Sequence, residues 1–460
     1  MSGYPELVLA RRANCLSDLE RHEELDSLLS RELPRLEALQ VGHDHEENRV
    51  GASANLARAW THWMESHIRR GRTPRAFELQ GRARARWFDE SIGATEPSLV
   101  ELQAKLRQQK AVMLALGGVQ GSAGMAFLVT PDSLSVHRFV LADMMREARA
   151  FRTAISGRGS QQSIDAIGAR LATGLLPAAL ARLPAGIERF VVIPPALAED
   201  LPWEAIPLPG AHARRLVVRF ATHVSPSGAA WMALHERPVV PGIVVAFGDP
   251  DVQTSAAVGD RAAGPGADAT RRRLPHAREE ARHAAGPTGR VWLGSAATGT
   301  RFRQEILREP VIHVAAHGVI LPGDASRSGL ALSGPNGLVT PAEIGALRIR
   351  ADLVTLSACH GDRGPAFIGE GQLGFARAFL QAGARSVLTT RWEVGDRSAA
   401  RMMHWFYSGL RSGLARDESL RRARLAATAA GLPLRDIHAF VLHGAAGTPV
   451  AALIQGGRGR

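Results

Sequence analysis

Two consecutive apolar stretches of this 460-residue chain end in side chains that can take part in covalent catalysis. The stretch VIHVAAHG ends in His317 before a glycine, and the next apolar stretch, LVTLSAC, ends in Cys359. A free thiol is a poor nucleophile at neutral pH because only a few per cent of it is ionised, and a nearby imidazole can take its proton. The pair therefore indicates thiol chemistry, provided that the fold brings the two side chains together.

Residues 241–460 alternate between apolar runs and amphipathic runs, which predicts strands separated by helices. The predicted strands lie in GIVVAFGDP, RVWLGS, PVIHVAAHG, DLVTLSAC, RSVLTTRW and AFVLHG. Continuous apolar strands of this kind are typical of a mostly parallel sheet that is covered on both faces. Sites in such sheets form at the carboxyl ends of the strands, and strands joined by one short helix are usually neighbours. We therefore expect His317 and Cys359 at one edge of the sheet.

The rest of the chain divides into two further parts. Residues 1–110 carry leucines and tryptophans at helical spacing, which predicts a helical region that includes one helical-repeat-like hairpin. No second copy recurs at a fixed period, so a tandem array is not supported. Residues 111–240 begin with short apolar runs divided by Gly, Pro and Asp, which predicts a β-meander. A helical stretch, a buried strand and a short helix are predicted to follow it.

The composition narrows the class of protein. The net charge is +12, yet the arginines are spread along the whole chain, often beside acids, so we expect no nucleic-acid binding. The two cysteines, Cys15 and Cys359, lie in different predicted parts, which argues against a disulfide framework and for a reducing compartment. No signal peptide and no run of roughly 18 apolar residues is present. We therefore expect a cytoplasmic protein without a membrane span.

Three other interpretations of the pair remain to be weighed. Taken singly, Cys359 fits a small buried side chain and His317 a hydrogen-bonding residue at a strand end. A metal site would use His313, His317, Cys359 and His360, but residues four apart on a strand are about 13 Å apart, so one ion cannot bind both His313 and His317. The run GDRGPAFIGEGQLG has no lysine and does not fit a phosphate loop. We expect neither a metal nor a cofactor.

Ordered motifs across residues 295–445 resemble the CHAT domain, a caspase-like family related to separase in clan CD of the cysteine peptidases. They are VIHVAAHG, GLALSGPNGLVTPAEIGALRIRADLVTLSACHGDRG, GEGQLGFARAFLQAGARSVLTTRWEVGD and MMHWFYSGLRSG. Weaker similarity extends back to about residue 110, through ERFVVIPPALAEDLPWEAI, VSPSG and AFGDP. The resemblance implies an α/β fold with a caspase-like, mostly parallel sheet at 241–460. A β-containing half at 111–240 and a helical region at 1–110 would precede it.

The resemblance also implies roles for individual residues. His317 would be the general base and Cys359 the nucleophile, while the backbone N–H groups of Gly318 and Cys359 would form the oxyanion hole. Separase-like relatives receive a basic P1 side chain in an acidic motif after the following strand, which here contains Glu393 and Asp396. The alternative for Asp396 is that it caps a helix starting at the next residue. No orienting Asp or Asn is identifiable, which matches a dyad more than a triad.

The function implied by the family is that of a cysteine endopeptidase that stays latent until a partner or signal activates it. Its substrate would be a protein, in some bacterial relatives a pore-forming protein, and its setting bacterial defence or cell death. The helices of residues 1–110 are candidates for binding a regulatory protein. The alternative is a catalytically inactive CHAT scaffold that serves as a protein-interaction module, and the retained His317 and Cys359 argue against it.

Overall fold

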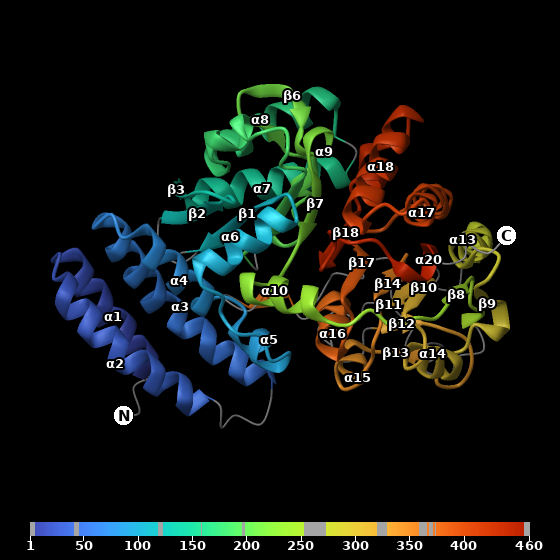
Figure 1. Ribbon diagram of the computed structural model, residues 1–460, viewed down its shortest axis with the longest axis horizontal. Helices are drawn as coiled ribbons and strands as arrows, with labels where there is room; N and C mark the ends of the chain where they lie inside the picture. Colours follow the sequence, from blue (N-terminus) through green and yellow to red (C-terminus); the bar gives the residue numbers. More distant parts are fainter. Residues whose placement is uncertain are drawn as a thin grey trace.

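A mixed sheet of eleven strands runs through the molecule and is covered by helices on both faces (Figure 1). This computed structural model describes residues 5–40, 46–117, 123–157, 159–195, 198–252, 273–319, 329–357, 366–367, 371–372 and 374–454. Most neighbouring strands are parallel, and the β1–β2, β2–β3 and β17–β18 pairs are antiparallel. The α/β fold class expected from the sequence, with helices flanking a mostly parallel sheet, is confirmed.

The strands of the large sheet follow one another in space in an order that differs from the chain order. From one edge to the other they are β3 (Leu134–Val140), β2 (Ala123–Val129), β1 (Ala111–Gly117), β4 (Arg189–Ile193), β7 (Ala221–Val224), β18 (Phe440–Gly444), β17 (Ser386–Thr390), β14 (Leu353–Leu356), β10 (Val311–Ala315), β8 (Val244–Gly248) and β9 (Arg290–Leu293). Smaller sheets are formed by β11 (His317–Val319), β12 (Gly329–Ala331) and β13 (Leu338–Val339), by β15 (Ala366–Phe367) and β16 (Gly371–Gln372), and by β5 (Pro207–Leu208) and β6 (Ala211–Arg215).

The helices fall into an N-terminal group and those that connect the strands. The first group is α1 (Pro5–Asp18), α2 (His22–Gln40), α3 (Glu46–Arg69), α4 (Thr73–Ala83), α5 (Arg86–Ser91) and α6 (Leu99–Gln108). The second is α7 (Leu141–Ser156), α8 (Gln161–Leu175), α9 (Leu216–Arg219), α10 (Gly228–Glu236), α13 (Pro275–Ala285), α14 (Gly299–Ile306), α15 (Pro341–Gly345), α16 (Phe375–Ala382), α17 (Asp396–Arg411), α18 (Arg416–Ala429), α19 (Leu434–Ile437) and α20 (Ala451–Ile454).

Strand β1 shows how the sheet acquires two buried faces. Its alternate side chains point to opposite sides, as the two-residue period of a strand requires. Val112 and Leu114 join a core with α7, α8, α17 and α18, whereas Met113 and Ala115 join a core with the N-terminal helices. On the second face of the C-terminal half, α14, α15 and α16 take the place of those helices. Both faces of the sheet are therefore covered over its central strands.

The N-terminal helices are packed on the sheet and continue its second layer. Leucines of α1, α2 and α3 and the stacked pair Trp60 and Trp63 share one core with β1 and β2. Arg84, just after α4, donates to Glu199 Oε1 at 3.0 Å and to the backbone oxygen of Pro226 at 3.1 Å. The helical region thus contacts the 111–240 part through both apolar and polar groups.

The two halves of the sheet meet at a narrow seam. Strand β7 pairs with β18 through one registered residue pair, Val224 with His443. The division of the chain at residue 240, predicted from the sequence, falls between α10 and β8. The strands before and after this position nevertheless belong to the same eleven-stranded sheet. The three-part division itself stays a prediction.

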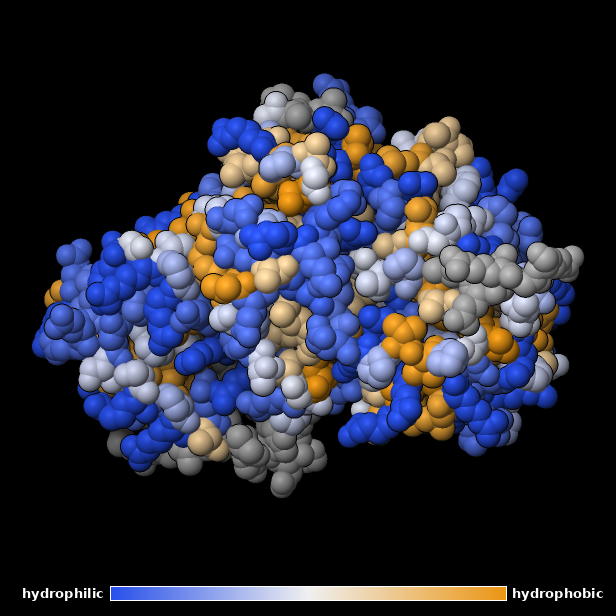
Figure 2. Space-filling view, in the orientation of Figure 1, coloured by the Kyte–Doolittle hydropathy of each residue, from blue (hydrophilic) through white to orange (hydrophobic). Residues whose placement is uncertain are grey.

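The surface is mostly hydrophilic in the view of Figure 2, with apolar residues in small separate groups. Among the helices of the described ranges, none combines the length and apolar character needed to cross a membrane.

Candidate active site

His317 lies where the chain leaves the large sheet. The sequence predicts it at the end of the β10 strand, but β10 ends at Ala315 and His317 begins β11 of a small antiparallel sheet. The backbone of His317 pairs with Ala331, and Gly318 pairs with Leu330. Backbone pairing therefore fixes the main chain on both sides of Ala316, and the partly buried His317 side chain stays at the carboxyl edge of the large sheet.

Strand β14 lies directly beside β10, as the short connection between them predicts. Val311 pairs with Leu353 in parallel register, and the ladder continues until the N–H of Ser357 donates to the backbone oxygen of Val314 at 2.8 Å. Ser357 precedes Cys359 by two residues in the sequence. Cys359 and His360 lie outside the described residues, so the role of the thiol stays a prediction.

A small cavity of about 40 Å³ opens beside His317 at this edge of the sheet. Its wall is formed by residues of β10, β17, α13 and α17 and by residues that follow β10, β14 and β17. They are Leu274, Ala277, Glu280, Ala315, Ala316, His317, Ser357, Thr390, Val394, Asp396 and Ala399. Four of these residues are alanines, and two others, Glu280 and Asp396, carry carboxylates.

Asp396 is one of the two carboxylates in this wall. It is the first residue of α17, and its Oδ2 accepts a hydrogen bond from the backbone N–H of His276 at 2.9 Å. The alternative expectation, that Asp396 caps a helix starting one residue later, is wrong. The helix begins at Asp396 itself, its N-cap is Gly395, and no side chain makes a cap hydrogen bond there. Asp396 instead ties the start of α17 to the start of α13.

Glu393, the other acid predicted to bind substrate, lies apart from this cavity. Its side chain is exposed and is not part of the cavity wall, and its backbone oxygen accepts from Arg435 at 3.1 Å. Of the two predicted acids, the structure brings Asp396 to the cavity of His317.

Glu280 is the second acid of the wall, and sequence reasoning missed it. It lies on α13 and is buried, and its Oε1 is 3.1 Å from Nε2 of His313. The available signal was the helical spacing, because Ala277, Ala281 and Ala284 occupy the same buried face of the run HAREEARHAA. An acid on the buried face of an amphipathic helix needs a partner, which here comes from β10.

His313 connects that acid to a buried hydroxyl pair. Its Nδ1 is 3.2 Å from the hydroxyl of Tyr407, which donates to Oγ1 of Thr355 at 3.0 Å. Burial raises the pKa of Tyr407 well above its ordinary value, which keeps the phenol neutral. His313 is thus fully buried, with Nδ1 at the Tyr407 hydroxyl and Nε2 within ion-pair distance of Glu280.

Comparison with known protein families matches the CHAT domain over residues 165–433, which is more than half of the chain. The chain belongs to the CHAT domain family. The cavity with His317, Glu280 and Asp396 therefore lies inside a CHAT domain, and the helices α1 to α6 precede the matched residues.

The CHAT domain shares its fold with separase. In two structures of the Saccharomyces cerevisiae separase–securin complex, the separase fold matches 92% of this chain at TM-scores of 0.55 and 0.54, with 10% sequence identity. The mouse (Mus musculus) Tetratricopeptide repeat protein 28 is 37% identical over 86 residues, or 19% of this chain. The chain spans 37% of the separase chain and 4% of the mouse protein. The caspase-like fold is thereby established.

Proposed function

We propose that this CHAT domain is a cysteine endopeptidase that uses a dyad of His317 and Cys359. The observation that carries the proposal is the cavity at the carboxyl edge of the sheet. Its wall contains His317, two carboxylates and Ser357, and Ser357 precedes Cys359 by two residues. Polar and charged groups that converge on a cavity at this edge are typical of a functional site in an α/β fold.

The proposed reaction proceeds through a thioester. His317 takes the proton of Cys359, and the thiolate attacks the carbonyl carbon of the peptide bond. The backbone N–H groups of Gly318 and Cys359 stabilise the oxyanion, the C–N bond breaks, and the leaving amine takes the proton from His317. His317 then removes a proton from water, which hydrolyses the thioester and releases the thiol.

The proposed substrate carries Arg or Lys at P1. Asp396 and Glu280 support this preference, because they are the acids in the cavity beside His317. Glu393, predicted alongside Asp396, is exposed. Its charge would act on the P1 side chain only over a longer distance, where salt screens it. The substrate itself would be a protein, and a pore-forming protein is one candidate from the family resemblance.

The proposal includes regulation by a protein partner. The structurally similar separase was solved in complex with securin, a protein partner. For this chain, the N-terminal helices are the proposed binding region, and latency before activation is part of the proposal. A cytoplasmic, reducing setting suits a nucleophile that must stay a free thiol. A role in bacterial defence or cell death rests on the family resemblance.

The test compares wild type with Cys359→Ala, His317→Ala and Cys15→Ala on fluorogenic peptides with Arg, Lys, Leu or Asp at P1. Cys15 is exposed on α1, which makes it a matched control for loss of a thiol. We expect cleavage after Arg or Lys that survives in Cys15→Ala and falls by roughly 100-fold or more in the two dyad variants.

A second readout does not depend on an activating signal. Iodoacetamide at pH 6 should alkylate Cys359 faster than Cys15, and His317→Ala should remove the difference, because the imidazole supplies the thiolate. Equal alkylation of both cysteines, together with no cleavage of any peptide, would favour the inactive scaffold instead.

A further inference from the structure

The segment 391–396 joins β17 to α17 and supplies part of the cavity wall. Thr390 before the segment and Val394 and Asp396 within it line the cavity. The N–H of Arg391 donates to the backbone oxygen of Ala439 at 2.8 Å, and beyond this bond the segment leaves the ladder between β17 and β18. The position of Asp396 relative to His317 therefore depends on the contacts that hold this segment.

An acid from the other half of the sheet contacts the Arg391 side chain, whose Nη1 also donates to the backbone oxygens of His438 and Phe440 at 3.0 Å. Glu204 lies in the short 3-10 helix Trp203–Ala205, which belongs to the N-terminal half of the CHAT domain. Its Oε1 and Oε2 accept from Nη1 and Nη2 of Arg391 at 3.2 and 3.3 Å. Both side chains are about 1% exposed, so this two-point contact is shielded from water. Two parallel hydrogen bonds fix orientation as well as distance.

The surroundings of Glu204 make it the negative centre of a buried cluster. Arg424 Nη2 lies 3.2 Å from Oε1, and His438 Nδ1 lies 3.3 Å from the same atom. Burial alone would raise the pKa of Glu204, but Arg391 and Arg424 outweigh it and hold the pKa well below its ordinary value. Burial lowers the pKa of His438 to about 4, so the imidazole is neutral at pH 7. A single carboxylate thus faces two buried guanidinium groups.

We propose that Glu204 is a positioning residue for the substrate pocket. Through Arg391, it sets where the segment 391–396 presents Asp396 to the P1 side chain, so that the N-terminal half of the domain controls specificity in the C-terminal half. The specificity part of this inference rests on the proposed peptidase function.

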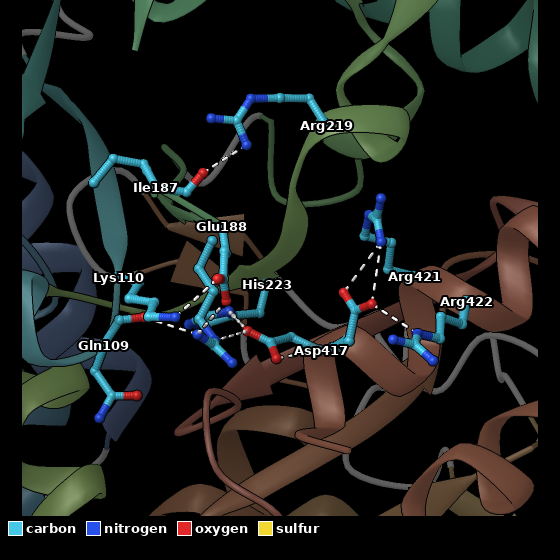
Figure 3. A network of polar contacts seen from close by, with 11 residues as sticks. Gln109, Lys110, Ile187, Glu188, Arg219, His223, Asp417, Arg421 and Arg422 are labelled. Carbon is cyan, nitrogen blue, oxygen red and sulfur yellow. Dashed lines mark hydrogen bonds and ion pairs between the residues drawn. The ribbon is translucent and has the colours of Figure 1, made fainter. Parts of the chain in front are cut away.

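A second buried acid crosses the seam in the opposite direction and provides a control. Asp417 at the start of α18 is fully buried, and its Oδ2 lies 3.1 Å from Nε of Arg189 on β4 and 3.3 Å from Nδ1 of His223 on β7 (Figure 3). It joins the same two halves, but its partners lie outside the segment 391–396. Removing its charge weakens the seam without releasing Arg391.

The experiment measures amide hydrogen exchange of residues 388–397 and steady-state cleavage of Arg and Leu peptides in full-length wild type, Glu204→Gln, Glu204→Asp and Asp417→Asn. For Glu204→Gln we expect at least tenfold faster exchange in this segment. We also expect kcat/KM for the Arg peptide to fall by roughly ten- to a hundredfold, as misplacement of a binding group does, with a smaller change for the Leu peptide. Glu204→Asp keeps the charge and should show a smaller change of the same kind.

Asp417→Asn should lower the melting temperature while leaving both the exchange of 388–397 and the ratio of Arg to Leu cleavage close to wild type. The positioning role would be overturned if residues 388–397 exchanged in Glu204→Gln at the wild-type rate. It would also be overturned if Glu204→Gln and Asp417→Asn changed this exchange and the cleavage ratio equally. If wild type cleaves no peptide and iodoacetamide alkylates Cys359 and Cys15 equally, the peptidase proposal fails, while the exchange comparison still decides whether Glu204 orders the segment.

Discussion

His317 and Asp396 line one cavity, although one follows β10 and the other begins α17. Strand register and one hydrogen bond bring the two residues together. The register of β10 with β14 and of β14 with β17 aligns the carboxyl ends of the three strands. The contact of Asp396 with His276 then fixes the start of α17 against α13, the helix that carries Glu280. One histidine and two carboxylates therefore line the same small cavity.

This arrangement predicts unequal effects of the two acids that follow β17. Asp396→Asn should lower kcat/KM for a P1 Arg peptide by roughly ten- to a hundredfold, because a charge-assisted contact is lost inside a cavity. Glu393→Gln, at an exposed position, should change it less than about threefold, since exposed charge pairs contribute little. Parallel kinetics on Arg and Leu peptides measure both. A larger loss in Glu393→Gln would contradict the assignment of the cavity.

The buried hydroxyl pair predicts a stability effect. Tyr407→Phe removes the group that bridges His313 and Thr355, and it should lower the free energy of unfolding by about 1–3 kcal/mol, as buried polar groups lose a partner. Urea unfolding measures this. The double variant Tyr407→Phe/Thr355→Val should lose less than the sum of the single variants. Strict additivity would show that the two hydroxyls do not interact.

His438 predicts acid sensitivity with a defined direction. Its pKa is lowered from 6.5 to about 4 by burial, so between these values the unfolded chain binds a proton that the folded chain does not. The contribution of His438 to the free energy of unfolding is therefore complete above pH 6.5 and is lost as the pH drops. Between pH 7.5 and 4.5 this loss should amount to about 2–3 kcal/mol.

The measurement for His438 is urea unfolding across this pH range. His438→Gln should flatten the fall by roughly that amount, whatever it does to the stability at pH 7.5. An unchanged slope between pH 6.5 and 4.5 would contradict the assignment to His438.

Two glycines predict opposite outcomes for the same substitution. Gly383 follows α16 with φ of +132°, and an added Cβ would come within 2.0 Å of the backbone oxygen of Ile349. Gly383→Ala should therefore lower the free energy of unfolding by about 3 kcal/mol or more. Gly174, on the exposed side of α8, has nothing within 4 Å, and Gly174→Ala should stabilise by about 0.5–1 kcal/mol. Thermal unfolding of both variants measures the contrast.

The sequence predicted local structure well and long-range partners poorly. The runs VIHVA and LVTL indicated neighbouring strands because a buried parallel strand needs a continuous apolar stretch and a short connection limits the topology. The turn at Ala316 that moves His317 onto a second sheet has no local signature of that kind. Whether Asp396 or Glu393 faces the cavity depends on where α17 starts, and a shift of one residue rotates a helical side chain by about 100°.

The sequence did not predict which residues pair with the buried charged side chains. Glu204 follows β4 and Arg391 follows β17, and these two strands are separated in the sheet by β7 and β18. Asp417 and His223 are likewise far apart in the sequence. Which distant residues meet across a crossover is decided by strand order, and hydrophobic periodicity does not encode that order.

The narrow seam has a practical consequence for engineering. A cut after residue 240 would give two pieces. Each would have one newly exposed strand edge and one acid whose arginine partner lies on the other piece. Such pieces are complementary in shape and in charge. With the proposed peptidase activity, the two pieces fused to proteins that bind each other would form a split reporter whose proteolytic signal returns only on reassembly.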